Sequence, residues 1–265
     1  MANSSSPSVI GRVMVILNLF REHKPWITIE DVATALEVSA PSAYRYAGEL
    51  TQAGLLLRTS GRYRLGPKII ELEYLIRSYD PIIQAAHNLL YGLAELTECD
   101  VLLCNVYDQT IVNVFHVPGK HPVNLTYTKG LPMPLFRGSQ AHVILAHMER
   151  RKLKRIYDAA MADPALAADA RAIGSDWAAF SKELKRIRNS GYYISRGELD
   201  KDVTGVAAPV FDEKGEIVGS LVLSLNIKAS PPISEEMLIG MVIQTANEIT
   251  KRIEQMAVEP TLPSP

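Results

Sequence analysis

The chain has 265 residues, 47% apolar and 22% charged, which is typical of a soluble globular protein with one or two domains. No apolar stretch approaches the roughly 18 residues of a membrane span, and the first residues lack a secretory signal pattern. A net charge of −1 excludes a wholly basic surface but allows a local basic patch. Cys99 and Cys104 are expected on opposite faces of one strand, hence unpaired, in a cytoplasmic protein without membrane contact.

The first predicted element is a helix over residues 8–23, because its apolar residues recur at helical spacing. These residues are Val9, Val13, Ile16, Leu17 and Phe20.

The segment from residue 28 to residue 64 then has the pattern of a winged helix-turn-helix. Thr28 and Asp31 have the spacing of a capping box in front of a helix. After a turn at Val38, Ser39 is placed to cap a second helix, with Pro41 in its first turn. Gly54 is expected to end that helix. The two helices are predicted over residues 29–36 and 40–52.

Two short strands over residues 55–59 and 62–65 are predicted to meet in a turn at Ser60-Gly61. Residues 58–68 contain four basic residues and no acidic ones. This hairpin is therefore the expected site of the local basic patch.

The inward face of the second helix is only partly determined by the pattern. We expect Leu50 and Ala47 to face inward, together with Tyr44. Tyr44 and Tyr46 lie two residues apart, about 200° around a helix axis, so the two side chains cannot lie on the same face of the helix. One of the two tyrosines is therefore expected in the core.

An amphipathic segment over residues 67–78 predicts a helix that leads out of this unit, and Asp80-Pro81 ends it. The remaining chain mixes helices and strands, which predicts an α+β domain with an antiparallel sheet of five or six strands. Its helices are predicted over residues 82–97, 139–148, 149–161, 176–189 and 234–256. Its strands are predicted over residues 100–107, 110–117, 122–128, 191–196, 205–211 and 216–227, with a loop over 130–138.

Five blocks of this chain, in order, resemble the IclR family of bacterial transcriptional regulators. They are SVIGRVMVILNLF, ITIEDVATALEVSAPSAYRYAGELTQAGLL, YRLGPKIIELE, GLPMPLFRGSQAHVILA and GYYISRGELDKDVTGVAAPVFDEKGEIVGSLVLS. The resemblance implies an N-terminal winged helix-turn-helix joined by a linker helix to a GAF-like effector domain. The implied boundaries are 1–66 for the DNA-binding domain, 67–80 for the linker, 81–257 for the effector domain and 258–265 for a disordered tail.

The resemblance also implies the partners: double-stranded operator DNA, a small organic acid or aromatic effector, and a second copy of the chain. Such regulators bind pseudo-palindromic operators as dimers or pairs of dimers. Whether they repress or activate depends on where the operator lies relative to the promoter. Arg45 is the first choice for a base or phosphate contact. The candidate DNA-binding residues are Ser8, Arg12, Thr28, Ser39, Pro41, Ser42, Ala43, Tyr44, Arg45, Tyr46, Arg58, Arg62 and Tyr63.

The effector pocket is expected where the helix after the Gly-Leu-Pro loop meets the central strands. The candidate residues are Met133, Phe136, Gly138, Ser139, His142, Ser195, Gly205, Val222 and Ser224. Four positions depart from the family pattern: Ala141-His142 replaces a Gly-Lys pair, Gly205 replaces a cysteine and Val222 replaces a serine. We therefore expect a roomier, more apolar pocket suited to an aromatic or branched ligand, with Ser195, Ser224 or backbone N–H groups holding its polar end. The alternative is that Gly205 and Val222 are ordinary core residues and that the ligand binds elsewhere.

No catalytic motif is present: the chain lacks G-x-S-x-G, a P-loop, G-x-G-x-x-G and H-E-x-x-H. His142 and His147 are five residues apart, which is not the spacing of two metal ligands on one helix face. We therefore expect no enzyme, no cofactor and no metal. The alternative to a ligand-responsive DNA-binding regulator is a small-molecule sensor or enzyme that uses the winged helix only for dimerisation. A protein-interaction module is a third possibility.

Overall fold

The structure is a computed structural model, and it describes residues 8–21, 23–227 and 233–258. The tail predicted over residues 258–265 lies, after Val258, outside the described residues. The chain divides into two compact units, residues 1–78 and 79–265. In the part that the structure describes, no helix combines the length and apolar character needed to cross a membrane.

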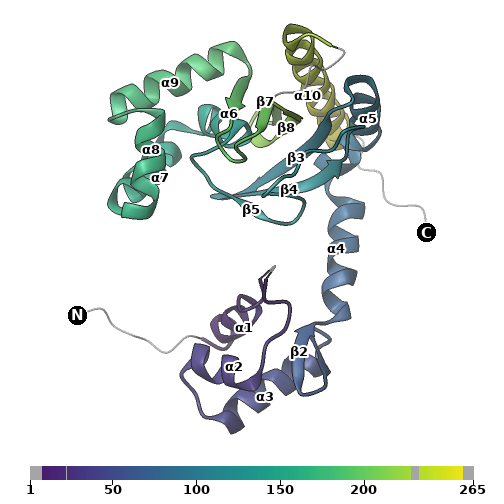
Figure 1. The fold of residues 1–265 in the computed structure, drawn as a ribbon, viewed down its shortest axis with the longest axis vertical. Helices are drawn as coiled ribbons and strands as arrows, with labels where there is room; N and C mark the ends of the chain where they lie inside the picture. Colours follow the sequence, from purple (N-terminus) through teal and green to yellow (C-terminus); the bar gives the residue numbers. More distant parts are fainter. Residues whose placement is uncertain (1–7, 22, 228–232, 259–265) are drawn as a thin grey trace. The chain divides into compact units, whose positions relative to one another are not determined.

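The N-terminal unit contains three helices and a hairpin: α1 (Val9–Leu17), α2 (Ile29–Leu36), α3 (Ala40–Gln52), β1 (Leu56–Thr59) and β2 (Arg62–Leu65) (Figure 1). The predicted bounds of α2 and α3 are confirmed, and the capping box of Thr28 and Asp31 is formed. Gly54 follows α3 with a φ of 75°, the left-handed conformation that ends a helix. Strong local capping signals explain this agreement.

The predicted extension of the first helix to residue 23 is wrong, because α1 ends at Leu17. Beyond it the chain turns back, and Arg21 and Lys24 exchange two backbone hydrogen bonds of 3.2 and 2.9 Å. Leu19 and Phe20 still pack against the core of the unit. Their apolar character therefore reports burial and not a continuing helix.

Tyr46 is the tyrosine of α3 that faces the core, together with Ala47 and Leu50. Tyr46 is 8% exposed and Tyr44 is 50% exposed, so the predicted inward orientation of Tyr44 is wrong. The hairpin is joined to this core through Ile27, whose backbone exchanges hydrogen bonds of 2.9 and 2.8 Å with Tyr63.

The linker helix α4 (Pro67–Tyr79) has no buried residue. Most of its apolar side chains are instead exposed, and Ile70 is 72% exposed. An exposed apolar helix face of this kind is typical of an interaction surface.

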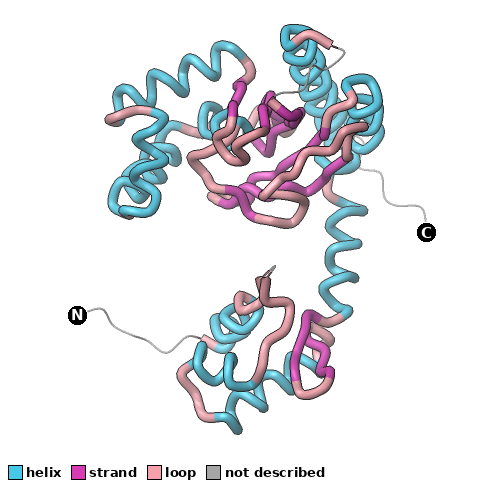
Figure 2. The backbone as a smooth tube through the Cα atoms, in the orientation of Figure 1, coloured by secondary structure: helices cyan, strands magenta, loops and turns pink. Residues whose placement is uncertain are grey.

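The C-terminal unit is built on one antiparallel sheet, whose strands are magenta in Figure 2. The strand order is β5-β4-β3-β8-β7-β6. The strands are β3 (Asp100–Tyr107), β4 (Thr110–Val117), β5 (Pro132–Met133), β6 (Tyr193–Arg196), β7 (Val203–Phe211) and β8 (Ile217–Asn226). The helices are α5 (Pro81–Thr97), α6 (Ser139–His147), α7 (Arg150–Ala162), α8 (Pro164–Ile173), α9 (Trp177–Ser190) and α10 (Glu235–Val258).

Alternate residues of the central strands face two different cores, as the period of a strand requires. Val101 and Leu103 of β3 pack with α5 and α10 on one face of the sheet. Leu102 and Cys104 pack with α6 to α9 on the other. The second core positions the helix α6 against the inner strands, where the effector pocket was expected.

The strand predicted over residues 122–128 is wrong, and the short strand β5 forms the sheet edge instead. Segment 122–128 is an irregular loop whose backbone is held by side chains. The Asn113 amide donates to the Tyr127 carbonyl at 2.8 Å, and the Asp100 carboxylate accepts from the Val123 N–H at 2.9 Å. Its alternating apolar residues therefore reflect contacts of a covering loop. The sequence reasoning also missed α8.

Candidate functional site

The exposed side of α3 carries the candidate base-reading surface. Pro41, Tyr44 and Arg45 are exposed, and Ser42 is half-buried. Ser39 precedes the helix, but its hydroxyl makes no capping bond and instead lies 3.2 Å from the Ser42 hydroxyl. The first turn of α3 thus presents small and polar groups, which allow a close approach to a DNA groove.

Arg45 is exposed, and its guanidinium lies over an aromatic ring of the core. Its guanidinium is 5.1 Å from the centroid of the Tyr46 ring, which is close enough for a cation–π contact. Arg12 of α1 lies 5.6 Å from the same ring and donates to the Tyr46 hydroxyl. Tyr46 therefore links the two arginines and orients both.

Three candidate DNA contacts are corrected by the structure. Ala43, Tyr46 and Tyr63 are buried in the core of the unit, so their side chains are not available to DNA. The periodicity of the helix α3 and of the strand β2 requires some residues of each element to face inward.

Two further candidates are helix caps. The Ser8 hydroxyl accepts from the Gly11 N–H at 3.1 Å, and the Thr28 hydroxyl accepts from the Asp31 N–H at 3.3 Å. The Asp31 carboxylate accepts from the Thr28 N–H at 2.8 Å and from Lys24 at 2.6 Å. The Lys24 bond and the Thr28 N–H hold the pKa of Asp31 below its usual value. Each of these hydroxyls already accepts a capping hydrogen bond. A DNA contact by Ser8 or Thr28 would therefore have to use the O–H donor or the remaining lone pair of the hydroxyl.

The hairpin presents three exposed arginines, and two of them rest on aromatic rings. Arg58 lies 5.9 Å from the Tyr63 centroid and Arg64 lies 6.0 Å from the Trp26 centroid, while Arg62 is at the turn. Ser60 and Gly61 both have positive φ, as a tight hairpin turn requires. The buried Tyr63 thus supports the basic patch from beneath.

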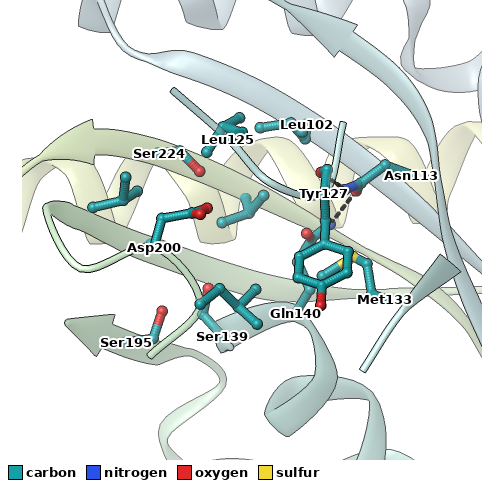
Figure 3. Close-up of a pocket in the computed structure, with 14 residues that line it drawn as sticks. Leu102, Asn113, Leu125, Tyr127, Met133, Ser139, Gln140, Ser195, Asp200 and Ser224 are labelled. Atoms are coloured by element: carbon teal, nitrogen blue, oxygen red, sulfur yellow. Dashed lines mark hydrogen bonds between the residues drawn. The ribbon is translucent and has the colours of Figure 1, made fainter. Parts of the chain in front are cut away.

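The candidate effector site is a cavity of about 40 Å³ between α6, the six strands β3 to β8, and two loops (Figure 3). That volume has room for a few water molecules as the structure stands. Of the predicted residues, Met133, Ser139, Ser195, Gly205, Val222 and Ser224 line it.

Phe136, Gly138 and His142 do not line the cavity. Their contacts lie in the structure around it. Phe136 packs on Phe180 in the second core. Gly138, with a φ of 85°, donates its N–H to the Glu198 carboxylate at 3.0 Å. The His142 Nδ1 lies 2.8 Å from the Gly138 carbonyl oxygen.

The His142 ring stacks on Tyr193, with centroids 4.4 Å apart. Tyr193 donates to Glu198 at 3.0 Å, and burial together with that carboxylate raises the pKa of Tyr193. These contacts connect the start of α6 to the loop before β7.

Gly205 does not enlarge the cavity as predicted. A Cβ added there would lie 2.6 Å from the Ser139 hydroxyl oxygen and 3.1 Å from that of Ser195. The two hydroxyls converge on the space that the missing side chain leaves. The two hydroxyls thus line the cavity together with apolar side chains such as Leu102 and Val222.

Two buried amides that sequence reasoning missed form part of the lining. Gln140 of α6 donates to the Asn113 side-chain oxygen at 3.0 Å, and Asn113 donates to the Tyr127 carbonyl. Asn113 is 1% exposed and Gln140 is 4% exposed. A polar residue inside an apolar strand (TIVNVFHV) was the signal that could have identified Asn113.

Two loops close the cavity from outside. Leu125 and Tyr127 come from one, and Leu199 and Asp200 come from the other. Thr126 joins them, because its hydroxyl donates to the Asp200 carboxylate at 2.5 Å and its N–H lies within 3.2 and 3.3 Å of the two oxygens.

Among the described residues no three His, Cys, Asp or Glu side chains are grouped as a metal site would need. Cys99 and Cys104 are both free and buried. Burial raises the pKa of Cys104 to about 11, so its thiol is protonated at neutral pH.

Both units match models of one protein family. The C-terminal domain of the bacterial transcriptional regulator IclR matches residues 76–251, and the IclR helix-turn-helix domain matches residues 9–60. The chain belongs to the IclR family of bacterial transcriptional regulators. It is thus an IclR-type transcriptional regulator, with a DNA-binding helix-turn-helix and an effector domain.

Similar IclR-type sequences include two curated regulators. The HTH-type transcriptional regulator KipR of Bacillus subtilis is 24% identical over 213 residues, which cover 80% of this chain and 83% of KipR. The Pca regulon regulatory protein of Pseudomonas putida is 20% identical over 219 residues, which cover 82% of this chain and 74% of that protein.

Solved IclR structures share the fold. A regulator from Silicibacter sp. superimposes with a TM-score of 0.75 at 20% identity, covering 93% of this chain and 96% of that one. An IclR homolog from Microbacterium hydrocarbonoxydans, complexed with 4-hydroxybenzoate, gives a TM-score of 0.74 at 17% identity, covering 94% and 100%.

Proposed function

We propose that this IclR-type regulator binds a pseudo-palindromic operator as a dimer or dimer of dimers, and that a small organic effector in the α6 cavity changes its affinity for DNA. One observation carries the proposal. The same chain combines an exposed, arginine-bearing winged helix with a partly open cavity that is lined by polar and apolar side chains. The functional boundaries that we propose are 1–66 for DNA binding, 67–80 for the linker and 81–257 for the effector domain.

The DNA-binding role is divided between two elements. Arg45 and Tyr44 on α3 approach base edges in the major groove, and the small residues Pro41 and Ser42 allow α3 to enter it. Arg58 and Arg62 of the hairpin neutralise phosphates, which sets register and supplies affinity without reading sequence. Arg12 reaches the backbone from α1.

Self-association is supported by apolar side chains that one chain leaves uncovered. Val9, Ile10 and Met14 of α1 are exposed, as are Ile70 and Leu75 of α4. A second copy that buries these faces would stabilise the dimer by the hydrophobic effect. It would also place two recognition helices on one operator.

A physical route for the effector signal begins in the cavity. Leu102 of β3 lines it, and Asn105 and Tyr107 further along β3 donate to the Asp80 carboxylate at 3.2 and 3.3 Å. Asp80 is the single residue between α4 and α5. An effector that favours one position of β3 would therefore bias the end of the linker helix, and only such differential binding can shift DNA affinity.

The effector is proposed to be a small organic molecule. A few convergent polar groups among apolar lining residues are typical of ligand sites, and the Microbacterium relative holds 4-hydroxybenzoate. No cofactor or metal is part of the proposal.

Selection from a random duplex library tests the DNA half of the proposal. We expect enriched duplexes with inverted half-sites about one helical turn apart, or a multiple of that. Affinity should fall steeply as salt rises, because phosphate contacts release counterions. A protein that remains oligomeric but retains no duplex at low salt would instead favour a sensor whose winged helix serves only dimerisation.

A further inference from the structure

The charge of the cavity lining limits what it can hold. Of the fourteen described residues that line it, Asp200 is the one with a charged side chain, and none is Lys, Arg or His. Lining groups that can hydrogen-bond include the Ser139, Ser195 and Ser224 hydroxyls and the Asn113 and Gln140 amides. A bound anion would therefore find donors but no cation to offset a nearby carboxylate.

The position of Asp200 is fixed by the loop that faces it. Thr126 donates its hydroxyl and its N–H to the Asp200 carboxylate, at 2.5 Å for the hydroxyl. In Figure 3 the Asp200 side chain extends into the same space as the hydroxyls of Ser139, Ser195 and Ser224. The carboxylate is thus held at the cavity and cannot swing away at low cost when a ligand enters.

An ionised carboxylate can only accept hydrogen bonds. It attracts a ligand O–H, N–H or ammonium group, and it repels a second carboxylate brought close to it in a half-buried site. The serine hydroxyls and the amides can donate as well as accept, so they satisfy the remaining polar atoms of an uncharged ligand.

We propose, on the basis of the effector function proposed above, that Asp200 makes this cavity selective for small ligands that donate a hydrogen bond and carry no negative charge. Alcohols, amides and amines belong to that class. Organic acids of the same shape are discriminated against in their ionised form.

Two matched ligand series test the selectivity at neutral pH. One is 4-hydroxybenzoate, 4-hydroxybenzamide and 4-hydroxybenzyl alcohol, and the other is propionate, propionamide and propan-1-ol. Binding to the full chain is measured by calorimetry and by the rise in Tm with ligand concentration. For the series that the wild-type cavity accepts, the amide and the alcohol should bind at least about tenfold tighter than the acid.

The Asp200→Asn variant tests the assignment to this residue. Asparagine keeps the shape and an oxygen that can accept from Thr126, but it removes the charge. The ratio of the Kd of the acid to the Kd of the amide should fall to about threefold or less, mainly because the acid binds more tightly. Asp202→Asn is the matched control, because it removes the same charge from an exposed residue of the same loop outside the lining. In Asp202→Asn the ratio of the two Kd values should stay as in the wild type.

Several outcomes would overturn the proposal. Equal or tighter binding of the acid by the wild type would do so, as would an unchanged ratio of the two Kd values in Asp200→Asn. Failure of every compound to bind either protein would remove the cavity as a ligand site, and with it the effector half of the proposed function. If the amide binds selectively yet leaves retention of a selected operator unchanged, the selectivity stands and the regulatory coupling fails.

Discussion

Arg45 shows how one buried aromatic side chain prepares a residue for recognition. The Tyr46 ring beneath it restricts the guanidinium, and Arg12 holds the Tyr46 hydroxyl from the other side. For the proposed contact of Arg45 with DNA, this order reduces the side-chain entropy that binding would cost. The sequence predicted Arg45 as the recognition residue, but the role of Tyr46 required knowledge of which helix face is buried.

We expect Arg45→Ala to weaken binding to a selected operator by about tenfold or more, since one good base contact is worth about 1–3 kcal/mol. Ligand binding should be unchanged, because Arg45 belongs to the other unit. Fluorescence anisotropy with a labelled duplex measures the first effect and calorimetry the second. Arg155→Ala, at an exposed position of α7, is the control. Wild-type operator affinity in Arg45→Ala would show that the recognition face is misassigned.

Gly205 is required by close packing and not by backbone conformation. We expect Gly205→Ala to lower the free energy of unfolding by about 1 kcal/mol and to abolish ligand binding, because the new methyl group displaces the Ser139 and Ser195 hydroxyls. Urea unfolding and Tm shifts with ligand measure the two effects. Gly92→Ala on α5 has open space around its Cβ and should be neutral or stabilising. Full ligand binding by Gly205→Ala would contradict the proposed site.

At the scale of elements, the sequence predicts best those elements whose stabilising contacts lie within a few residues along the chain. The helices α2 and α3 were predicted with their bounds because caps and a turn glycine act within a few residues. The loop over 122–128 was mistaken for a strand because its conformation depends on Asp100, Asn113 and Asp200, which are remote in sequence. The pattern of apolar and polar residues within a segment does not reveal contacts with residues that are remote in sequence.

The capping box of α2 predicts a pH dependence. The folded-state pKa of Asp31 is lowered, so its stabilising effect is complete above the ordinary aspartate pKa of about 3.9 and is lost as pH falls through the lower folded value. At pH 7 we expect Asp31→Asn to be less stable than the wild type by about 0.5–1 kcal/mol. That difference should shrink below about pH 4.

Urea titrations of the full chain at pH 7 and pH 3 measure this difference, with the methyl NMR signals of Ile29 and Val32 reporting on α2. Glu49→Gln, an exposed acid on α3 without a capping role, is the control. A deficit of equal size at both pH values would show that the charge of Asp31 does not contribute.

At the scale of the whole molecule, the exposed apolar residues of α1 and α4 support the proposal that the chain self-associates. A pseudo-palindromic operator needs two recognition helices with a fixed separation. Self-association through the N-terminal unit would supply both helices. In the proposed mechanism, the effector domain acts by changing the arrangement that this dimer prefers.

Ile70→Glu should shift the protein toward monomer and lower operator affinity by about a hundredfold, because two half-sites then bind independently. Multi-angle light scattering and analytical ultracentrifugation report the mass. Leu166→Glu places the same charge at an exposed apolar position of α8 and should leave the mass unchanged. A wild-type mass for Ile70→Glu would place any self-association on another surface.

The sequence alone determined the family, the two-part organisation and the elements of the winged helix, because these depend on local capping, periodicity and ordered motifs. It also identified six residues that line the cavity. Only the tertiary structure decided which tyrosine of α3 is buried and how Asn113, Gln140 and Asp200 complete the cavity. These features depend on side chains from different strands and loops meeting in space, and the distance between residues along the chain does not specify such meetings.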